Sequence, residues 1–228
     1  MCGRYTVLTE DEIIEIREIL KKLSLRIVRD DFEEYDEASA SNGGTGEVFP
    51  TNHAPVITKS NDGIAFESVK WGFKKWNSPG VIINARSETM RNKSTFSKHL
   101  ETGRCVVPAG EFFEWEKLDK GKKKHYAKDR DGNLLFMAGL YRDVKDENAP
   151  EAIQNDSSGI VREFVIITKE ATGEMAKIHD RMPVILRVEQ IEPWLTGLMT
   201  PEDIEKMEFD VSVNPCDEGN TEEQISLF

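Results

Sequence analysis

The chain alternates many short apolar segments with few helical patterns, which predicts an α+β fold with a mostly antiparallel, barrel-like sheet. Turn residues such as Asn61-Asp62-Gly63 and Asp131-Gly132-Asn133 separate the apolar segments. No internal repeat or linker divides the sequence, so we expect one domain over residues 1–228, with 214–228 as a polar, acidic tail. The predicted strands are Ala54–Thr58, Ala65–Trp71, Val81–Asn84, Arg104–Pro108, Leu134–Arg142 and Glu163–Thr168.

The first predicted element is a helix over Glu10–Leu23. Thr9 and Glu12 form a capping-box pair at its start. Apolar residues recur along it at helical spacing, which gives it one buried face. Shorter helices are expected over Ser94–Leu100 and Val188–Leu198, and a last one opens at Thr200, where a cap residue precedes a proline. Composition predicts a surface loop over Ser39–Gly46 and a solvated hairpin over Lys117–Arg130.

Composition indicates a soluble chain, with 38% hydrophobic and 32% charged residues among 228. The longest apolar runs are too short to span a bilayer, and no apolar stretch follows the initiator as in a signal peptide. The three cysteines show no CxxC spacing and the four histidines are scattered. We therefore expect no disulfide framework, no metal and no cofactor. A cytoplasmic monomer with reduced thiols is the default expectation.

The net charge of −12 is unevenly distributed. Residues 1–50 hold 12 acids and 6 bases, and residues 201–228 hold 9 acids and 1 base, so the two ends contribute −14 together. Residues 51–200 carry 23 bases against 21 acids, or about +2. Because the distribution of charge matters more than its sum, this composition neither predicts nor forbids nucleic-acid binding.

Cys2 is the first candidate for chemistry. If Met1 is removed, one residue presents both a thiol and an α-amine, whose pKa of about 7.7–8.0 compares with about 10.4 for lysine. Such an amine forms a Schiff base with an aldehyde, and the thiol can then close onto the imine carbon as a thiazolidine. The alternative is a small residue that merely follows the initiator.

The segment Ile83–Thr89 places three polar side chains at the end of an apolar strand. If it is extended, Asn84, Arg86 and Glu88 share one face. The amide of Asn84 could orient an amine or an aldehyde oxygen, and Arg86 could bind phosphate. A simple salt bridge between Arg86 and Glu88 at a strand end is the alternative.

A carboxylate lies among aromatic residues in Glu111-Phe112-Phe113-Glu114-Trp115. Desolvation there would raise its pKa and suit proton transfer. The sequence pattern alone leaves Glu111 and Glu114 both open, and a glutamate on the surface of an aromatic strand is the alternative for either.

His179 and Arg181 lie in a loop before a Met-Pro step. The histidine can carry protons near pH 7, and the arginine can bind phosphate, although a lone histidine is more often structural. Two tryptophans, Trp71 and Trp76, could stack on bases, but one of them is expected to belong to the core.

Together and in this order, these motifs resemble the SRAP family (SOS response-associated peptidase, abasic-site processing proteins). The resemblance covers the chain from residue 1 to about 214 and rests on these segments: Met1–Tyr5, Phe49–Asn52, Trp71-Gly72, Ile83–Thr89, Arg104–Pro108, Phe113–Trp115, His179–Pro183 and Val213-Asn214.

The resemblance implies a barrel-like α+β fold, loss of Met1 by self-processing or an aminopeptidase, and hydrolase- and lyase-type activity. The implied partner is single-stranded DNA containing an abasic site, to which Cys2 links through a thiazolidine. Asn84 would then position the reacting groups, Glu114 would transfer protons, and His179 would assist ring opening and crosslink reversal. The implied DNA contacts are Arg4, Arg86 and Arg181 on phosphates, with Trp71 and Pro50 wedging or stacking on bases.

The chain departs from the family pattern at Asn52, at Phe73–Trp76 and at Ala109–Glu111, which makes base stacking less secure than the chemistry. Two other functions stay open. One is an N-terminal-nucleophile cysteine hydrolase that acts on a small amide through Cys2. The other is a non-catalytic single-strand binding module in which the cysteine is incidental.

Overall fold

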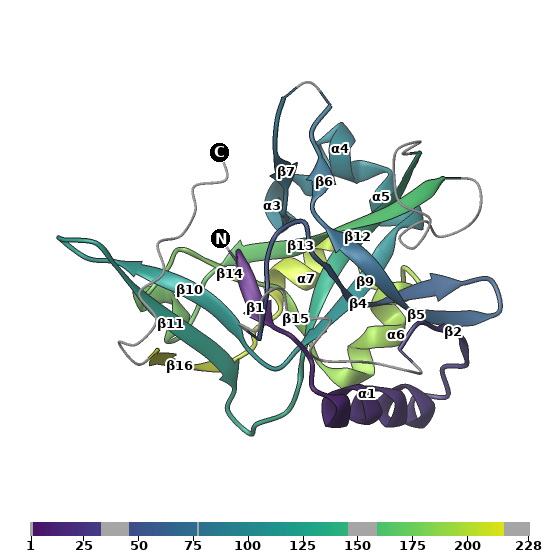
Figure 1. The fold of residues 1–228 in the computed structure, drawn as a ribbon, viewed down its shortest axis with the longest axis horizontal. Coiled ribbons are helices and arrows are strands. Elements are labelled where there is room, and N and C mark those ends of the chain that lie inside the picture. Colours follow the sequence, from purple (N-terminus) through teal and green to yellow (C-terminus); the bar gives the residue numbers. More distant parts are fainter. Residues whose placement is uncertain (1, 33–45, 77, 146–158, 217–228) are drawn as a thin grey trace.

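Five strands close into a barrel (Figure 1). In the computed structural model, which describes residues 2–32, 46–76, 78–145 and 159–216, antiparallel pairings run in the order β13-β12-β9-β4-β5, and a parallel pairing of β5 with β13 completes the ring. A closed ring leaves none of these five strands as a sheet edge. The predicted α+β fold with a barrel-like sheet is therefore confirmed. The strands are β4 (His53–Ser60), β5 (Gly63–Trp71), β9 (Arg104–Ala109), β12 (Leu135–Lys145) and β13 (Ile160–Glu170).

Shorter strands extend the barrel. β2 (Ile27–Asp30) pairs with β5, β15 (Ile185–Leu186) pairs with β12, and both β8 (Asn84–Arg86) and β14 (Arg181–Pro183) pair with β13. A separate hairpin joins β6 (Phe73–Lys74) to β7 (Val81–Ile82) and projects from the barrel (Figure 1).

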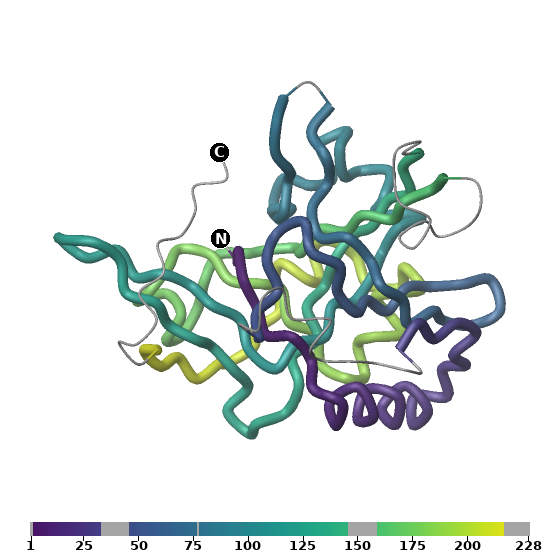
Figure 2. Tube along the Cα trace, in the orientation of Figure 1, coloured from purple at the N-terminus to yellow at the C-terminus, as the bar shows by residue number. Residues whose placement is uncertain are grey.

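A second sheet holds the N-terminal strand. Its order is β16-β11-β10-β1-β3, and the trace in Figure 2 shows the purple N-terminal segment beside the teal strands of this sheet. β10 and β11 form the hairpin predicted over residues 117–130, although β10 begins earlier, at Phe112. The strands are β1 (Arg4–Thr6), β3 (Glu47–Val48), β10 (Phe112–Lys117), β11 (Lys122–Asp129) and β16 (Val211–Pro215).

The helices are mostly shorter than predicted. α1 (Glu10–Lys22) has the expected capping box and buries its apolar face against the barrel. The helix predicted over residues 94–100 is two short ones, and the helix predicted over 188–198 is a 3₁₀ turn followed by α6. The remaining helices are α3 (Ser87–Met90), α4 (Ser94–Ser97), α5 (His99–Thr102), η3 (Met175–Lys177), η4 (Val188–Gln190), α6 (Ile191–Leu195) and α7 (Pro201–Lys206).

Two local predictions are wrong. The strand predicted over residues 81–84 is divided, because the chain leaves the β6–β7 hairpin after Ile82 and pairs with β13 from Asn84 onward. Glu88 does not lie on the same strand face as Asn84, because the strand ends and α3 begins at Ser87. The first two residues of the predicted tail, 214 and 215, belong to β16. The predicted loop residues 39–45 and the tail residues 217–228 lie outside the described residues.

Two hydrophobic clusters pack against opposite faces of the barrel strands. On β9, for example, Val106 belongs to the cluster that includes α1 and α6, whereas Cys105 and Val107 belong to the cluster that includes Cys2 and the second sheet. The N-terminal cysteine is thus part of a packed core. Among the described residues, no helix has the length and apolar character needed to cross a membrane.

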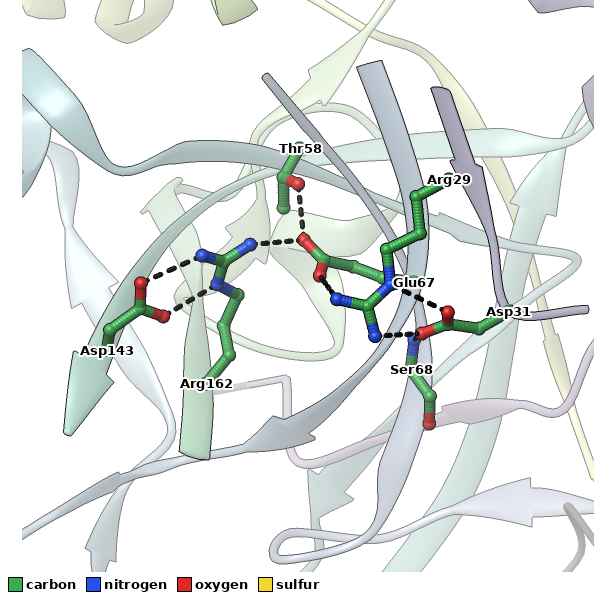
Figure 3. A network of polar contacts seen from close by, with 7 residues as sticks. All are labelled: Arg29, Asp31, Thr58, Glu67, Ser68, Asp143 and Arg162. Carbon is green, nitrogen blue, oxygen red and sulfur yellow. Dashed lines mark hydrogen bonds and ion pairs between the residues drawn. The ribbon is translucent and has the colours of Figure 1, made fainter. Parts of the chain in front are cut away.

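A network of charged side chains surrounds the buried carboxylate of Glu67 (Figure 3). Glu67 on β5 accepts hydrogen bonds from the hydroxyl of Thr58 and from Arg162, whose Nη1 lies 2.5 Å away, and Arg29 Nη1 lies 3.4 Å from its other oxygen. Arg162 also pairs with Asp143 at 2.7 Å, and Arg29 with Asp31 at 2.8 Å. These contacts connect β2, β4, β5, β12 and β13, so Glu67 is a structural carboxylate with a full set of partners.

Candidate active site

Cys2 lies just before β1 and is fully buried, with its Sγ 3.8 Å from the carbonyl oxygen of Arg4. Burial, followed by the nearby negative charge of Glu114, raises the pKa of the Cys2 thiol well above its ordinary range. The thiol is therefore protonated at neutral pH. All three cysteines of the chain are free, so none is held in a disulfide.

Asn84 holds the backbone of Cys2. Its Nδ2 donates a hydrogen bond to the carbonyl oxygen of Cys2 at 2.9 Å. β8 positions this side chain through its parallel pairing with β13, where Asn84 lies opposite Ile166. The Oδ1 of the same amide is buried, and no described residue donates a hydrogen bond to it. This oxygen is thus a hydrogen-bond acceptor that lies beside the first residues of the chain.

Glu114 projects from β10, which pairs with β1. The register matches Arg4 with Phe113, so its continuation by one residue sets Gly3 opposite Glu114. The carboxyl group is 2% exposed, and burial raises its pKa to about 7. A carboxyl group with that pKa can both give and take a proton at neutral pH. Glu111, the other glutamate of this motif, instead lies opposite Thr6 and lines a different hollow with Glu12 and Lys128.

His179 faces Glu114, with its Nε2 4.0 Å from a carboxylate oxygen. The backbone amide of Arg181 donates to Nδ1 at 3.0 Å, which assigns the proton of the neutral ring to Nε2. Asp180 Oδ1 lies 2.8 Å from the same Nδ1, a contact that is favourable only when Nδ1 carries a proton. Burial lowers the pKa of His179, so we take the neutral form as the resting one.

The structure therefore brings together the four residues that were predicted from the sequence to be catalytic. They come from four separate segments of the chain. Cys2, Asn84, Glu114 and His179 are linked by a hydrogen bond, by a strand pairing and by the 4.0 Å contact. Among the described residues, no group of three or more histidine, cysteine or acidic side chains is arranged to hold a metal ion. The chemistry available to these residues is proton transfer around an amine and a thiol.

The predicted phosphate-binding arginines have different surroundings. Arg86 is exposed on the same strand as Asn84 and forms no ion pair with the described residues. Arg181 is bound to both carboxylate oxygens of Glu88, at 2.6 and 3.0 Å, and donates to the carbonyl oxygen of Thr168. The predicted alternative, an Arg86–Glu88 pair, is therefore wrong, because α3 turns Glu88 toward Arg181.

Arg4 is 5% exposed and is held on several sides. Its guanidinium lies 4.2 Å from the ring centre of Phe49 and 5.2 Å from that of Trp115, and its Nη1 is 3.3 Å from a carboxylate oxygen of Glu47. Lys124 also pairs with Glu47. Glu47 is not recognisable as a partner of Arg4 from the sequence, because 43 residues separate them and no motif connects them.

Trp71 is a core residue, which corrects the prediction that it stacks on bases. Its side chain is fully buried, packs against Tyr5 and Phe164, and donates from Nε1 to the carbonyl oxygen of Ile83 at 3.1 Å. Pro50 is partly exposed in a turn that Asn52 closes by accepting from the amide of Phe49 at 2.9 Å, so its position allows the predicted contact. Trp76 is the exposed tryptophan of the pair.

Comparison with known proteins assigns this chain to a family. It belongs to the SOS response associated peptidase (SRAP) family, whose sequence profile matches residues 1–221.

Three relatives are called abasic site processing proteins. YoqW of Bacillus subtilis is 35% identical over 216 residues, which cover 89% of this chain and 84% of YoqW. YedK of Escherichia coli is 27% identical over 154 residues, covering 67% of this chain and 64% of YedK. HMCES of Gallus gallus is 33% identical over 138 residues, covering 52% of this chain and 39% of HMCES.

Solved structures share the fold. A protein from Bacteroides thetaiotaomicron superposes with a TM-score of 0.70 at 21% identity, over 95% of this chain and 93% of the other. A phage-related protein from Bordetella bronchiseptica gives a TM-score of 0.66 at 24% identity, over 95% of each chain. At these identities the likeness concerns the fold alone.

Proposed function

We propose that this protein processes abasic sites in single-stranded DNA by forming a covalent thiazolidine through Cys2 after Met1 has been removed. The family membership and the names of the relatives support the substrate class. The observation that carries the proposal is the placement of Cys2, whose carbonyl is held by Asn84 while Glu114, with a pKa of about 7, lies across the strand pair.

The proposed chemistry begins at the amine. The α-amine of Cys2 adds to the aldehyde carbon of the ring-opened sugar, and the aldehyde oxygen leaves as water to give an imine. The sulfur then adds to the same carbon, and the thiol proton ends on the nitrogen. The sum is one aldehyde and one aminothiol giving a thiazolidine and water. Glu114 suits both proton transfers, since a group with a pKa near the working pH is effective in either direction.

Asn84 and His179 support this sequence in different ways. The buried Oδ1 of Asn84 is an acceptor suited to the α-amine, and its Nδ2 fixes the Cys2 backbone. The neutral imidazole of His179 presents Nε2–H toward Glu114 and suits proton exchange during opening of the sugar ring. Arg86, exposed on the strand of Asn84, is available for a flanking phosphate.

The protonation state of the Cys2 thiol argues against the amide-hydrolase alternative. An acyl-transfer nucleophile acts as the thiolate, whereas burial and Glu114 keep the Cys2 thiol protonated. The proposed route uses the amine first and needs the sulfur only after the imine has formed. A thiol with a raised pKa is compatible with that order.

The decisive experiment is intact-mass measurement of the purified protein, first alone and then after incubation with an abasic-site single-stranded oligonucleotide. We expect loss of Met1, followed by a gain equal to the oligonucleotide mass minus water. Cys2→Ala should abolish the stable adduct, because its side chain cannot close onto the imine. Cys2→Ser should give only an imine adduct, which must be reduced with borohydride to be detected. The reason is that a serine hydroxyl closes onto an imine less readily than a thiol does.

Two outcomes would contradict the proposal. Retained Met1 would leave the amine blocked. A protein that has lost Met1 but gains no oligonucleotide would favour the amide hydrolase instead, and release of a small amine from amide substrates would then be the measurement to make.

A further inference from the structure

A second feature of the surface is a hollow of about 790 Å³ beside the β6–β7 hairpin. It is bordered by this hairpin, by α4 and α5, and by the ends of β12 and β13, which Figure 1 shows together on one side of the barrel. Cys2, Glu114 and His179 are not among its lining residues. We call it the lysine groove, after its cationic side chains: Lys70, Lys74, Lys75, Lys98, Arg142 and Lys145.

The lysine groove concentrates positive charge on an acidic protein. Six cationic side chains line it against two acidic ones, Asp143 and Glu163, although the whole chain carries −12. Both acids already have arginine partners. Glu163 accepts from Arg142 at 2.9 Å, and Asp143 pairs with Arg162 at 2.7 Å. The groove therefore has a strong excess of positive charge.

Four of the lysines that line the groove have no acidic partner among the described residues. Lys70, Lys74, Lys75 and Lys98 form no ion pair with any residue that the structure describes. Lysines gathered in this way repel one another, and a polyanion that binds between them relieves the repulsion and releases its own counter-ions. In a chain with this excess of acids, the simplest partner for such a surface is a polyanionic ligand.

Trp76 adds a stacking surface at the same place. It lines the groove and is 97% exposed, unlike the fully buried Trp71. The exposed indole ring of Trp76 presents a large apolar face to water. Beside lysines, such a ring is suited to a nucleic-acid base, since bases stack on aromatic rings without sequence preference. An acidic peptide would use the lysines but offers no comparable partner for the ring.

A short stretch of chain connects the groove with the active site. Ile82 lines the groove, and Asn84, two residues further on, donates to the carbonyl oxygen of Cys2. Two residues of extended chain span about 7 Å. The wall of the groove at Ile82 therefore lies within about 7 Å of Asn84, measured along the backbone.

We propose that the lysine groove binds the phosphodiester backbone of the DNA strand that flanks the lesion, with lysines contacting phosphates and Trp76 stacking on a base. This inference rests on the proposed function. It adds a binding segment beyond the reacting residue and beyond Arg4, Arg86 and Arg181. It also gives the acidic chain a local means of holding DNA.

The test compares two triple variants that change the net charge equally. The groove variant is Lys70→Glu, Lys75→Glu and Lys98→Glu, and the control is Lys22→Glu, Lys59→Glu and Lys206→Glu, at exposed lysines elsewhere. Each is titrated against a labelled single strand of about 25 nucleotides, with and without an abasic site, and against an abasic strand of about 5 nucleotides. A third variant has glutamine at the three groove positions. It removes the positive charges without reversing them, so it serves as the test if the glutamate variant fails to fold.

We expect the groove variant to bind the long strand at least about tenfold more weakly than the control variant, whether or not the strand is abasic. The slope of log affinity against log salt concentration should fall in magnitude by about 2, so the affinity difference from wild type should narrow as the salt concentration rises. Trp76→Ala should weaken binding of the long strand by about tenfold. Crosslinking of the short strand at saturating protein should be unchanged in the groove variant, in the control variant and in Trp76→Ala.

Equal affinity of the groove and control variants for the long strand would overturn the inference. Loss of short-strand crosslinking in a folded groove variant would also overturn it, because the lysines would then belong to the active site. If wild type forms no adduct with any abasic strand, the proposed function fails, but the comparison on the undamaged strand still decides whether the groove binds DNA.

Discussion

Two glutamates in different sheets are buried almost equally, with Glu67 1% exposed and Glu114 2%. Glu67 lies within a network of two arginines and a threonine hydroxyl that ties five strands together (Figure 3). Glu114 has a histidine at 4.0 Å, and burial raises its pKa to about 7. The same residue type at the same depth thus holds arginines together in one place and, in the proposed function, transfers protons in the other, because its partners differ.

The largest expected effect concerns the chemistry. Glu114→Gln should slow adduct formation on an abasic oligonucleotide by about 10²–10⁴-fold, the usual contribution of a positioned acid–base group. Glu67→Gln should leave the rate per folded molecule unchanged. Single-turnover gel assays measure both. Equal losses in the two variants would mean that Glu114 acts only through the fold.

The second effect concerns stability and should fall on Glu67. Glu67→Gln leaves Arg162 and Arg29 without the carboxylate between them, which should cost about 2–4 kcal/mol of the free energy of unfolding. The cost is at the lower end for buried pairs, because Arg29 is 41% exposed and both arginines keep an aspartate partner. Urea unfolding followed by circular dichroism measures it. A change below about 0.5 kcal/mol would show that the network contributes little.

The third effect has the opposite sign. The pKa of Glu114 is raised from 4.5 to about 7, so between these values the folded protein keeps a proton that the unfolded chain has released. Stability due to this group is present below pH 4.5 and is lost as pH rises through 7. Glu114→Gln should therefore stabilise the protein by on the order of 3 kcal/mol above pH 7 and not at all near pH 4.5.

Urea unfolding of wild type and Glu114→Gln across this pH range measures the third effect. The gain should grow with pH and then level off. A stability difference that does not change with pH would place the carboxyl group in an environment like water, and the proposed acid–base role would lose its basis.

The smallest effect should come from Glu88, a half-exposed carboxylate bound to Arg181. Glu88→Gln should free the guanidinium and strengthen binding of single-stranded DNA by about 2–5-fold at low salt. Arg86→Gln is the matched control, and it should weaken binding and lower the magnitude of the salt slope by about 0.7. Weaker binding by Glu88→Gln would mean that Glu88 holds Arg181 in its DNA-binding orientation.

The sequence predicted the strands better than the pairings between them. The apolar segments at residues 54–58, 65–71, 104–108 and 134–142 became β4, β5, β9 and β12 with small shifts of their ends, because alternation and turn residues are local signals. The break at Ile83 was not predictable, since it depends on two different partner strands. Which of Trp71 and Trp76 is buried was not predictable either, since the partners of Trp71, Tyr5 and Phe164, lie 66 and 93 residues away in the chain.

For the site, the sequence alone determined which residue types are present and their order: an N-terminal cysteine, an asparagine after a strand, a glutamate among aromatics and a histidine before a proline step. Those motifs also indicated the family. Only the tertiary structure decided that Asn84 holds Cys2, that Glu114 rather than Glu111 faces it, and that Arg181 and Arg4 are paired with Glu88 and Glu47. The reason is physical: local propensity depends on neighbours in the chain, whereas burial, pKa and ion pairing depend on groups that folding brings together from distant positions.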